Sequence, residues 1–220
     1  MKKYSDLRVA TKSEILENTA ASEPGARAGD YVAAIEIGYR SLSSYIRDLS
    51  FKPVTPENSL LLRHAALDAR LLCENLSMLV VALHEQQGFK VSKKQVTAWR
   101  TYDWSDDLKR EFPGFFPKPV TTGQESDGSM SFEACESPTA LDWQYAKTIL
   151  SNSGDVLHEG AKLKSAEQFS EFFNELVRFA ERFRSLLSSC VVYFGNGEDY
   201  RAILIDFDGE ADAQLGTPQV

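Results

Sequence analysis

Apolar residues recur every three or four positions along much of the chain, which is the spacing of one face of an α-helix. Residues 31–49 carry such a face, and Asp30 can cap this helix after the Pro- and Gly-containing loop expected at 22–30. The members of this face are Val32, Ile35, Tyr39, Leu42, Ile46 and Leu49. The segment from residue 59 to about residue 87 is apolar on nearly every side, which predicts the central helix of a bundle.

Two later segments show the same helical spacing. A helix that begins at Ser137-Pro138 is expected to end within residues 151–155, and a second helical stretch is expected to begin at Asp155. The last long helix covers residues 165–189 and has a wide stripe of phenylalanine and leucine.

The pattern changes after residue 189 to alternation with period two. β-Branched and aromatic residues lie on both sides of Asn196-Gly197, which predicts a β-hairpin with its turn at these two residues. An isolated hairpin is marginally stable in water, so we expect it to pack on the bundle or to pair with another strand. The tail 211–220 is expected to be loose.

These elements predict a mainly α protein, a four- or five-helix up-and-down bundle with a C-terminal β-hairpin. The expected organisation is an N-terminal extension over residues 1–30, a helical bundle over 31–189, and the hairpin and tail over 190–220. Residues 89–137 form an irregular insertion in the bundle, and their polar stretch 121–131 is expected to be an exposed loop.

Composition and charge narrow the function classes. The 220 residues include 24 basic and 32 acidic side chains, and the net charge of −8 argues against nucleic-acid binding by the whole surface. Short basic clusters, such as Arg178, Arg182 and Arg184, leave RNA binding in a local cleft open, although a solvated helix face explains them as well. Three widely spaced cysteines without a CxxC pair indicate a reduced, cytoplasmic compartment. No apolar segment is long enough to predict a membrane-spanning helix.

The long helix over residues 59–87 carries a polar stripe. Arg63, Arg70 and Glu74 share one helical face, and Arg70 and Glu74 are spaced to form an ion pair. Either this pair is structural and fixes the helix register, or the stripe lines a cleft for a ligand or an RNA backbone. His64 and Asp68 are also one turn apart, but nothing accompanies them that would complete a metal site.

The segment LSNSGDVLHEGAK, residues 150–162, is the most informative for chemistry. It places Asn152 and His158 six residues apart, beside the expected helix break. A histidine at such a junction can be a general base near neutral pH, or it can cap backbone carbonyls. The sequence contains no Gly-rich phosphate loop, so we expect no cofactor and no metal.

Two stretches resemble HEPN-type helical domains. ALDARLLCENLSMLV, residues 66–80, is similar to the central helix of that family, and LSNSGDVLHEG, residues 150–160, is similar to its later His-containing segment. The resemblance implies a metal-independent ribonuclease of prokaryotic toxin or phage-defence systems, in which a closely spaced Arg and His face a dimer cleft. This chain departs from that pattern, because Ser151 stands seven residues before His158 and no arginine occurs in residues 138–162.

We therefore expect a HEPN-like, non-catalytic interaction module of a prokaryotic defence or toxin–antitoxin type system. It would form a homodimer through its long helices and bind a partner protein or RNA. One alternative is an active ribonuclease, with His158 as base, Asn152 positioning, and Arg70 or Arg63 on the phosphate. Another alternative is a small-molecule-sensing bundle that uses the stripe of Arg63, Arg70 and Glu74.

Overall fold

A computed structural model gives the fold as four helices and a five-stranded antiparallel sheet among the residues that it describes. The described residues are 24–50, 52, 56–90, 115–124, 130–158, 165–194, 199–205, 207 and 214–216. The helices are α2 (Pro24–Leu49), α3 (Pro56–Gln86), α6 (Trp143–Leu157) and α7 (Ala166–Leu187).

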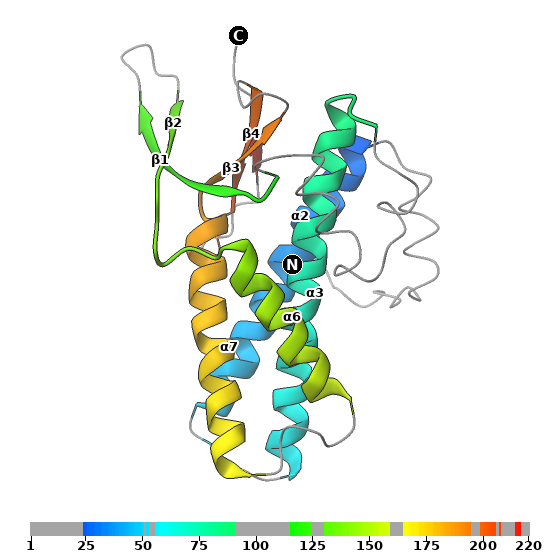
Figure 1. Cartoon of the computed structure of the whole chain (residues 1–220), viewed down its shortest axis with the longest axis vertical. Helices are drawn as coiled ribbons and strands as arrows, with labels where there is room; N and C mark the ends of the chain where they lie inside the picture. The colour runs from blue at the N-terminus through cyan, green and yellow to red at the C-terminus, as the bar shows by residue number, and fades with distance from the viewer. Residues whose placement is uncertain are drawn as a thin grey trace, which may run out of the picture.

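The helices run alternately down and up, as the colour gradient of Figure 1 shows. α3 packs against α2 along most of its length and also contacts α6 and α7. The predicted bundle, with the long apolar helix in contact with the other three, is therefore confirmed. Among the described residues, no helix combines the length and the apolarity that a membrane crossing requires.

The sheet lies at one end of the bundle, where α7 leads directly into its third strand (Figure 1). Its strands are β1 (Lys118–Gln124), β2 (Met130–Ala134), β3 (Cys190–Phe194), β4 (Asp199–Leu204) and β5 (Gln214–Gly216), in the order β2-β1-β3-β4-β5. Strands β3 and β4 form the predicted hairpin, with Val192 opposite Arg201. The expected turn at Asn196-Gly197 lies outside the described residues.

The region predicted as an irregular insertion contributes two strands. Strand β1 pairs with β3 through Lys118 opposite Val191, and β2 pairs with β1. The stretch expected as an exposed loop, residues 121–131, belongs mainly to these strands on either side of the undescribed residues 125–129. The prediction failed because Thr121, Thr122 and Gly123 are exposed, so these residues carry no apolar alternation. The tail predicted to be loose contains β5, which pairs with β4.

Helix α2 begins at Pro24, and the loop expected over residues 22–30 is wrong for its described part. Proline is well suited to the first turn of a helix, where its missing N–H is not needed. Arg27 and Ala28 are buried, and Arg27 forms an ion pair of 2.6 Å with Glu85 on α3. These tertiary contacts outweigh the low helix propensity of the two glycines in this turn.

Helix α6 differs from its prediction at both ends. It begins at Trp143, because Asp142 is its N-cap and accepts a hydrogen bond of 2.8 Å from the Tyr145 N–H. It also continues without a break through the expected interruption at residues 151–155. Ser153 and Val156 are buried there, so the packed face of the helix extends to its last turn.

The Phe-rich stripe of α7 forms part of the core, and the exposed apolar residues lie elsewhere. Its phenylalanines at 169, 172, 179 and 183 are buried against the other helices. The large exposed hydrophobic side chains of the described residues are Ile37 (70%), Leu60 (54%), Leu67 (41%) and Leu71 (41%). Three of these four belong to α3, the helix that contacts all the others.

Candidate functional site

Arg70 and Glu74, the centre of the predicted polar stripe, form an ion pair along α3. Nε of Arg70 donates to Oε1 of Glu74 at 2.9 Å, and the two side chains are 25% and 21% exposed. Ser77, at the end of the stripe, is buried and donates to the carbonyl of Cys73 in its own helix. The ion pair at the centre of the stripe is therefore half-buried.

Arg70 also lies against α6. A β-carbon added at Gly154 would lie 3.8 Å from Nη1 of Arg70, an ordinary van der Waals distance, so the guanidinium lies close to this residue of α6. His158 follows one helical turn later, and its backbone N–H donates to the Gly154 carbonyl at 3.0 Å. The fold thus brings Arg70 to the same part of α6 as His158. Arg63 lies two turns before Arg70, and its buried Nε has no hydrogen-bond partner among the described residues.

His158 and Asn152 do not act on one site. His158 is the exposed C-cap residue of α6 and has extended backbone angles. Six residues correspond to about 120° around a helix, so Asn152 faces a different direction. Its Nδ2 donates to both carboxylate oxygens of Glu175 on α7, at 2.8 and 3.0 Å. The expected combination of Asn152 and His158 in one catalytic group is therefore not formed.

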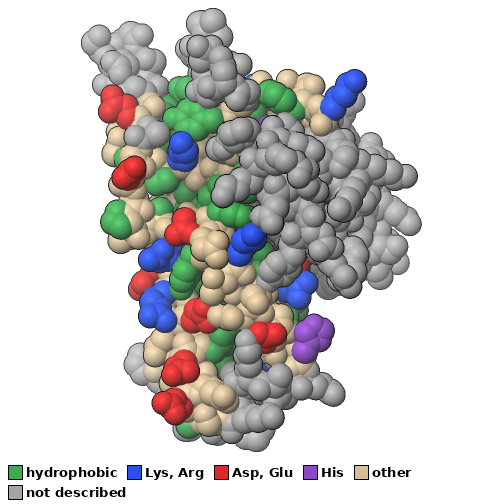
Figure 2. Space-filling view, in the orientation of Figure 1, with side chains coloured by type: hydrophobic (Ala, Val, Ile, Leu, Met, Phe, Trp, Pro, Cys, Tyr) green, Lys and Arg blue, Asp and Glu red, His purple; other side chains and the backbone are tan. Residues whose placement is uncertain are grey.

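Asn152 instead lines an open groove of about 640 Å³ between α6 and α7. The groove residues are Asn152, Val156, Gln168, Glu171, Phe172, Glu175 and Arg178. Its acidic residues, Glu171 and Glu175, outnumber its single arginine, which disfavours a phosphate-bearing ligand. Figure 2 shows the wider surface, where acidic and basic side chains are intermingled along the α7 edge.

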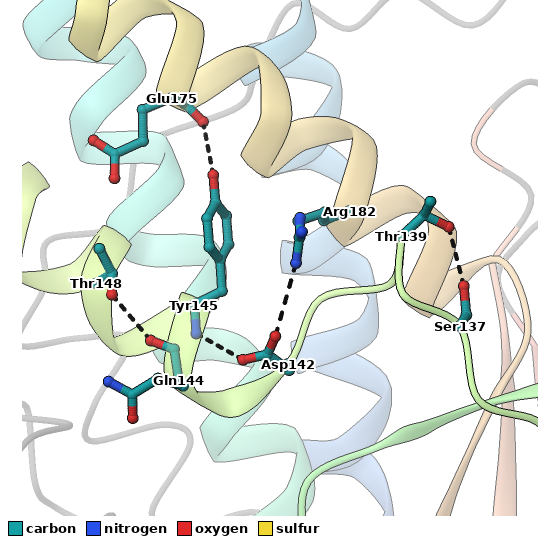
Figure 3. Close-up of polar contacts among 8 residues, drawn as sticks. All are labelled: Ser137, Thr139, Asp142, Gln144, Tyr145, Thr148, Glu175 and Arg182. Carbon is teal, nitrogen blue, oxygen red and sulfur yellow. Dashed lines mark hydrogen bonds and ion pairs between the residues drawn. The ribbon is translucent and has the colours of Figure 1, made fainter.

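Polar and aromatic contacts join α6 to α7 above this groove (Figure 3). The Tyr145 hydroxyl donates to the backbone carbonyl of Glu175 at 3.4 Å, and the Arg182 guanidinium lies 4.7 Å from the centre of the Tyr145 ring. Arg182 also lies 3.7 Å from the carboxylate of Asp142, the α6 N-cap. Burial, and next the nearby Glu175 carboxylate, raise the pKa of Tyr145, so its hydroxyl stays protonated and can donate. These contacts are structural, because each group is engaged within the bundle.

The other histidines and the cysteines have structural surroundings. His84 is buried at the end of α3, its Nδ1 lies 2.8 Å from the Val80 carbonyl oxygen, and burial lowers its pKa. Burial also raises the pKa of the Cys73 and Cys190 thiols, so both cysteines remain protonated and pack as small apolar side chains.

The pair of His64 and Asp68 faces α2. The His64 ring packs near the Tyr45 ring, with 5.8 Å between their centres, and Asp68 accepts a hydrogen bond from Ser41. Burial raises the pKa of Asp68, while the Ser41 hydrogen bond and nearby His64 oppose this effect. In the described part of the chain, no group of three or more His, Cys, Asp and Glu side chains is placed to hold a metal ion.

Sequence reasoning missed the residues that come together only in the fold. Glu175, which binds Asn152, lies 23 positions away along the chain, and no local pattern connects the two. It also missed a basic groove to which α2 contributes Arg40 and Arg47. That groove had a detectable signal, because these two arginines lie two helical turns apart on one face of α2.

Comparison of the chain with protein-family models, with curated proteins and with solved structures finds no match. The similarity to HEPN-type domains therefore depends on the two quoted stretches and the order of the helices. Arguments about function depend on the geometry of the described residues.

Proposed function

We propose that this protein is a HEPN-like, non-catalytic helical interaction module that pairs with a second copy of itself through the exposed face of α3. The exposed leucine stripe on this face carries the proposal. We define the leucine stripe as Leu60, His64, Leu67 and Leu71. The cysteine pattern suggests that such a module acts in the cytoplasm. The resemblance implies a prokaryotic defence or toxin–antitoxin type system, in which the dimer would bind a further protein or RNA.

The spacing of the leucine stripe supports helix pairing. Its members follow one another at intervals of four, three and four residues, which is the a/d pattern of a coiled-coil seam. All four side chains are exposed, although the opposite side of α3 is fully packed in the core. Three exposed leucines along one helical face are typical of a protein–protein contact, and His64 is the one polar member of the stripe.

Charges beside the leucine stripe favour a parallel pair. Arg63 lies on one flank of the stripe and Asp68 lies on the other. In a parallel two-stranded seam, a residue on the first flank of one helix faces a residue on the second flank of the other helix, five positions later in the sequence. The Arg63 position of each copy would therefore lie opposite the Asp68 position of the other, and Asp68 would have to turn away from Ser41 of its own α2 to pair with it. An antiparallel pair would instead bring Arg63 close to Arg70 of the second copy.

The surroundings of the predicted catalytic residues support a non-catalytic role. Asn152 is hydrogen-bonded to Glu175, and Arg70 is paired with Glu74. A phosphate would have to displace the Glu74 carboxylate to reach the Arg70 Nε. The α6 groove next to Asn152 is acidic, which disfavours an RNA backbone.

Engineered cysteines test both the pairing and its direction. In a parallel pair, Leu67→Cys should cross-link to the same residue of a second copy under mild oxidation, and the covalent dimer should appear on a non-reducing gel. Ile37→Cys is the matched control, because residue 37 is exposed on α2 and lies outside the leucine stripe. Cross-linking by the Leu60→Cys/Leu71→Cys double variant, without any by Leu67→Cys, would instead indicate an antiparallel pair.

Sedimentation equilibrium measures the pairing without cross-links. Leu67→Glu places a charge in the apolar seam and should convert the dimer to a monomer, while Ile37→Glu should leave the dimer intact. Leu67 is largely exposed in the single chain, so the variant is expected to fold, which circular dichroism checks. A wild-type protein that remains monomeric at all accessible concentrations would contradict self-association.

One observation favours a second function, a metal-independent ribonuclease. The Arg70 guanidinium lies beside Gly154, one helical turn from exposed His158. A His base and an Arg phosphate ligand in this proximity can support attack by a ribose 2′-hydroxyl. If this function is present, the wild type cleaves a labelled RNA pool without added metal, and His158→Ala and Arg70→Met each lose at least tenfold in rate. Absence of cleavage by the folded wild type excludes it.

A further inference from the structure

A second groove, between α2 and α7, has the opposite charge to the α6–α7 groove. It encloses about 320 Å³, near the lower end of the range for small-molecule sites. Its lining residues are Tyr39, Arg40, Ser43, Ser44, Arg47, Arg184 and Phe207. We call it the arginine groove. Its described lining residues include three arginines and no acidic residue, in a chain whose net charge is −8.

Helix α2 provides one wall of the arginine groove. Four polar residues of α2 have the i, i+3, i+4, i+7 spacing, so they lie on one helical face over two turns. They are Arg40, Ser43, Ser44 and Arg47. This face holds both guanidinium and hydroxyl donors, which are the groups that bind phosphate oxygens. Arg47 is exposed, and among the described residues its Nη2 makes a long contact of 3.5 Å with the Ser44 hydroxyl. Its donors are therefore accessible to a ligand.

Helix α7 and the segment after β4 provide the other wall. Arg184 lies in the last turn of α7, so its positive charge comes from a different helix and converges on the same groove. Phe207 is half-buried and packs on Tyr39, with 4.3 Å between the ring centres. Tyr39 stacks in turn near Phe183 of the core, at 6.2 Å. The groove thus has an aromatic surface that the core holds in place beside the arginines.

Some carboxylates accompany these arginines. Glu36 forms an ion pair with Arg40 one turn away, and this contact holds Arg40 in position without lining the groove. Asp206 and Asp208 flank Phe207 in the sequence and lie outside the described residues. A ligand must therefore compete with at least one carboxylate, which favours a doubly charged phosphate over a weaker anion.

From this convergence we propose that the arginine groove binds the phosphate of a nucleotide, free or within RNA. The arginines and serines hold the phosphate oxygens, and the exposed part of the Phe207 ring packs against the base. Guanidinium groups beside an aromatic ring are the combination that binds single nucleotides and single-stranded nucleic acid. The site uses neither the leucine stripe nor His158, so it is independent of the proposed self-association.

Isothermal titration calorimetry at low salt tests the proposal with inorganic phosphate, the four ribonucleoside monophosphates and a short single-stranded RNA. We expect a mononucleotide to bind more tightly than inorganic phosphate, because the base adds the contact with Phe207. Binding of RNA more tightly than any mononucleotide would identify RNA as the source of the phosphate, and the reverse order would identify a free nucleotide. Failure of the folded wild type to bind any of these probes overturns the proposal.

Variants locate the site. Arg47→Gln should weaken binding of every probe about tenfold, since it removes one charge-assisted contact. Phe207→Ala should weaken nucleotide binding and leave inorganic phosphate unchanged. Arg178→Gln is the matched control, because Arg178 is an exposed arginine of α7 that lies outside the groove. Equal affinity of Arg47→Gln and wild type, with Arg178→Gln also unchanged, would place binding elsewhere and refute the site. Arg47 is exposed, so its variant tests the proposal without disturbing the core.

Discussion

At the scale of single residues, Arg70 and Glu74 form an ion pair along one helix, whereas Asn152 is bonded to Glu175 on another. Spacing alone predicted the ion pair of Arg70 and Glu74, because both residues belong to one helix. Spacing could not show that Arg70 lies beside Gly154 or that Asn152 faces Glu175, since those partners come from other helices. The candidate site was therefore predictable within a helix and not between helices.

His84 provides a prediction at this scale. Burial lowers its folded-state pKa, so it folds as the neutral form while the unfolded chain titrates near the ordinary value of about 6.5. The neutral His84 contributes fully to the free energy of unfolding above about pH 6.5. This contribution is lost as pH falls from about 6.5 toward the folded-state pKa. The urea midpoint should therefore decrease between about pH 7.5 and pH 5.5.

The matched variants for this pH effect are His84→Leu and His64→Ala. His84→Leu removes the buried titrating group and should flatten the pH dependence of the urea midpoint. His64 is exposed, so His64→Ala should retain that dependence. Asp68 has the opposite effect, because its raised folded-state pKa makes the folded state more stable, not less, as pH falls. Asp68 therefore does not account for a loss of stability between about pH 7.5 and pH 5.5. Equal slopes for His84→Leu and wild type would refute the assignment.

At the scale of elements, the long helices were predictable and the short strands were not. Helix α7 was expected over residues 165–189 and spans Ala166–Leu187, because its stripe of buried phenylalanines has a strong helical period. Strands β1 and β2 lack such a signal, since the β1–β2 hairpin extends beyond the core and exposes Thr121 and Thr122. Loss of periodicity in the sequence therefore marks an exposed strand here and not an irregular loop.

Two helical glycines give a prediction for elements. Gly154→Ala should raise the free energy of unfolding by about 0.5–1 kcal/mol, because alanine favours the helix and the nearest group, Nη1 of Arg70, is 3.8 Å away. Gly38→Ala should give no such increase. Its β-carbon would lie 3.2 Å from Cδ2 of Leu72, a fully buried side chain on α3.

Chemical denaturation of the two alanine variants, compared with wild type, measures this difference. A gain at Gly38 equal to that at Gly154 would show that α2 and α3 do not need a glycine at their contact. A loss at Gly154 would show that the space beside Arg70 is required for packing.

At the scale of the whole molecule, the bundle and the sheet form one unit. Phe194 of β3 packs edge-to-face on His84 at the end of α3, with 4.8 Å between the ring centres. Core residues of the sheet, such as Val192 and Ile203, belong to the same apolar cluster as the helices. The hairpin of β3 and β4 thus packs on the bundle, as expected, and β3 also pairs with β1. Composition and local pattern gave the fold class, but strand order required pairing between distant segments.

The surface proposed for self-association and the groove proposed for nucleotide binding lie on different parts of the molecule. The leucine stripe lies on α3, while the arginine groove lies between α2 and α7. Self-association would therefore leave the groove arginines accessible, and a dimer would carry two such grooves. Nucleotide binding by the Leu67→Glu monomer with wild-type affinity is the expected result.

The position of β1 between β2 and β3 has a consequence for biosynthesis. Lys118 pairs with Val191, so 73 residues separate partners in adjacent strands. A nascent chain can form the contact between α2 and α3 as soon as both helices have left the ribosome. The β1–β2 hairpin must then wait, with one edge open, until the last helix and β3 have been synthesised. During this interval the exposed strand edge is a natural target for a chaperone, and slower translation of the last third of the chain would lengthen the exposure.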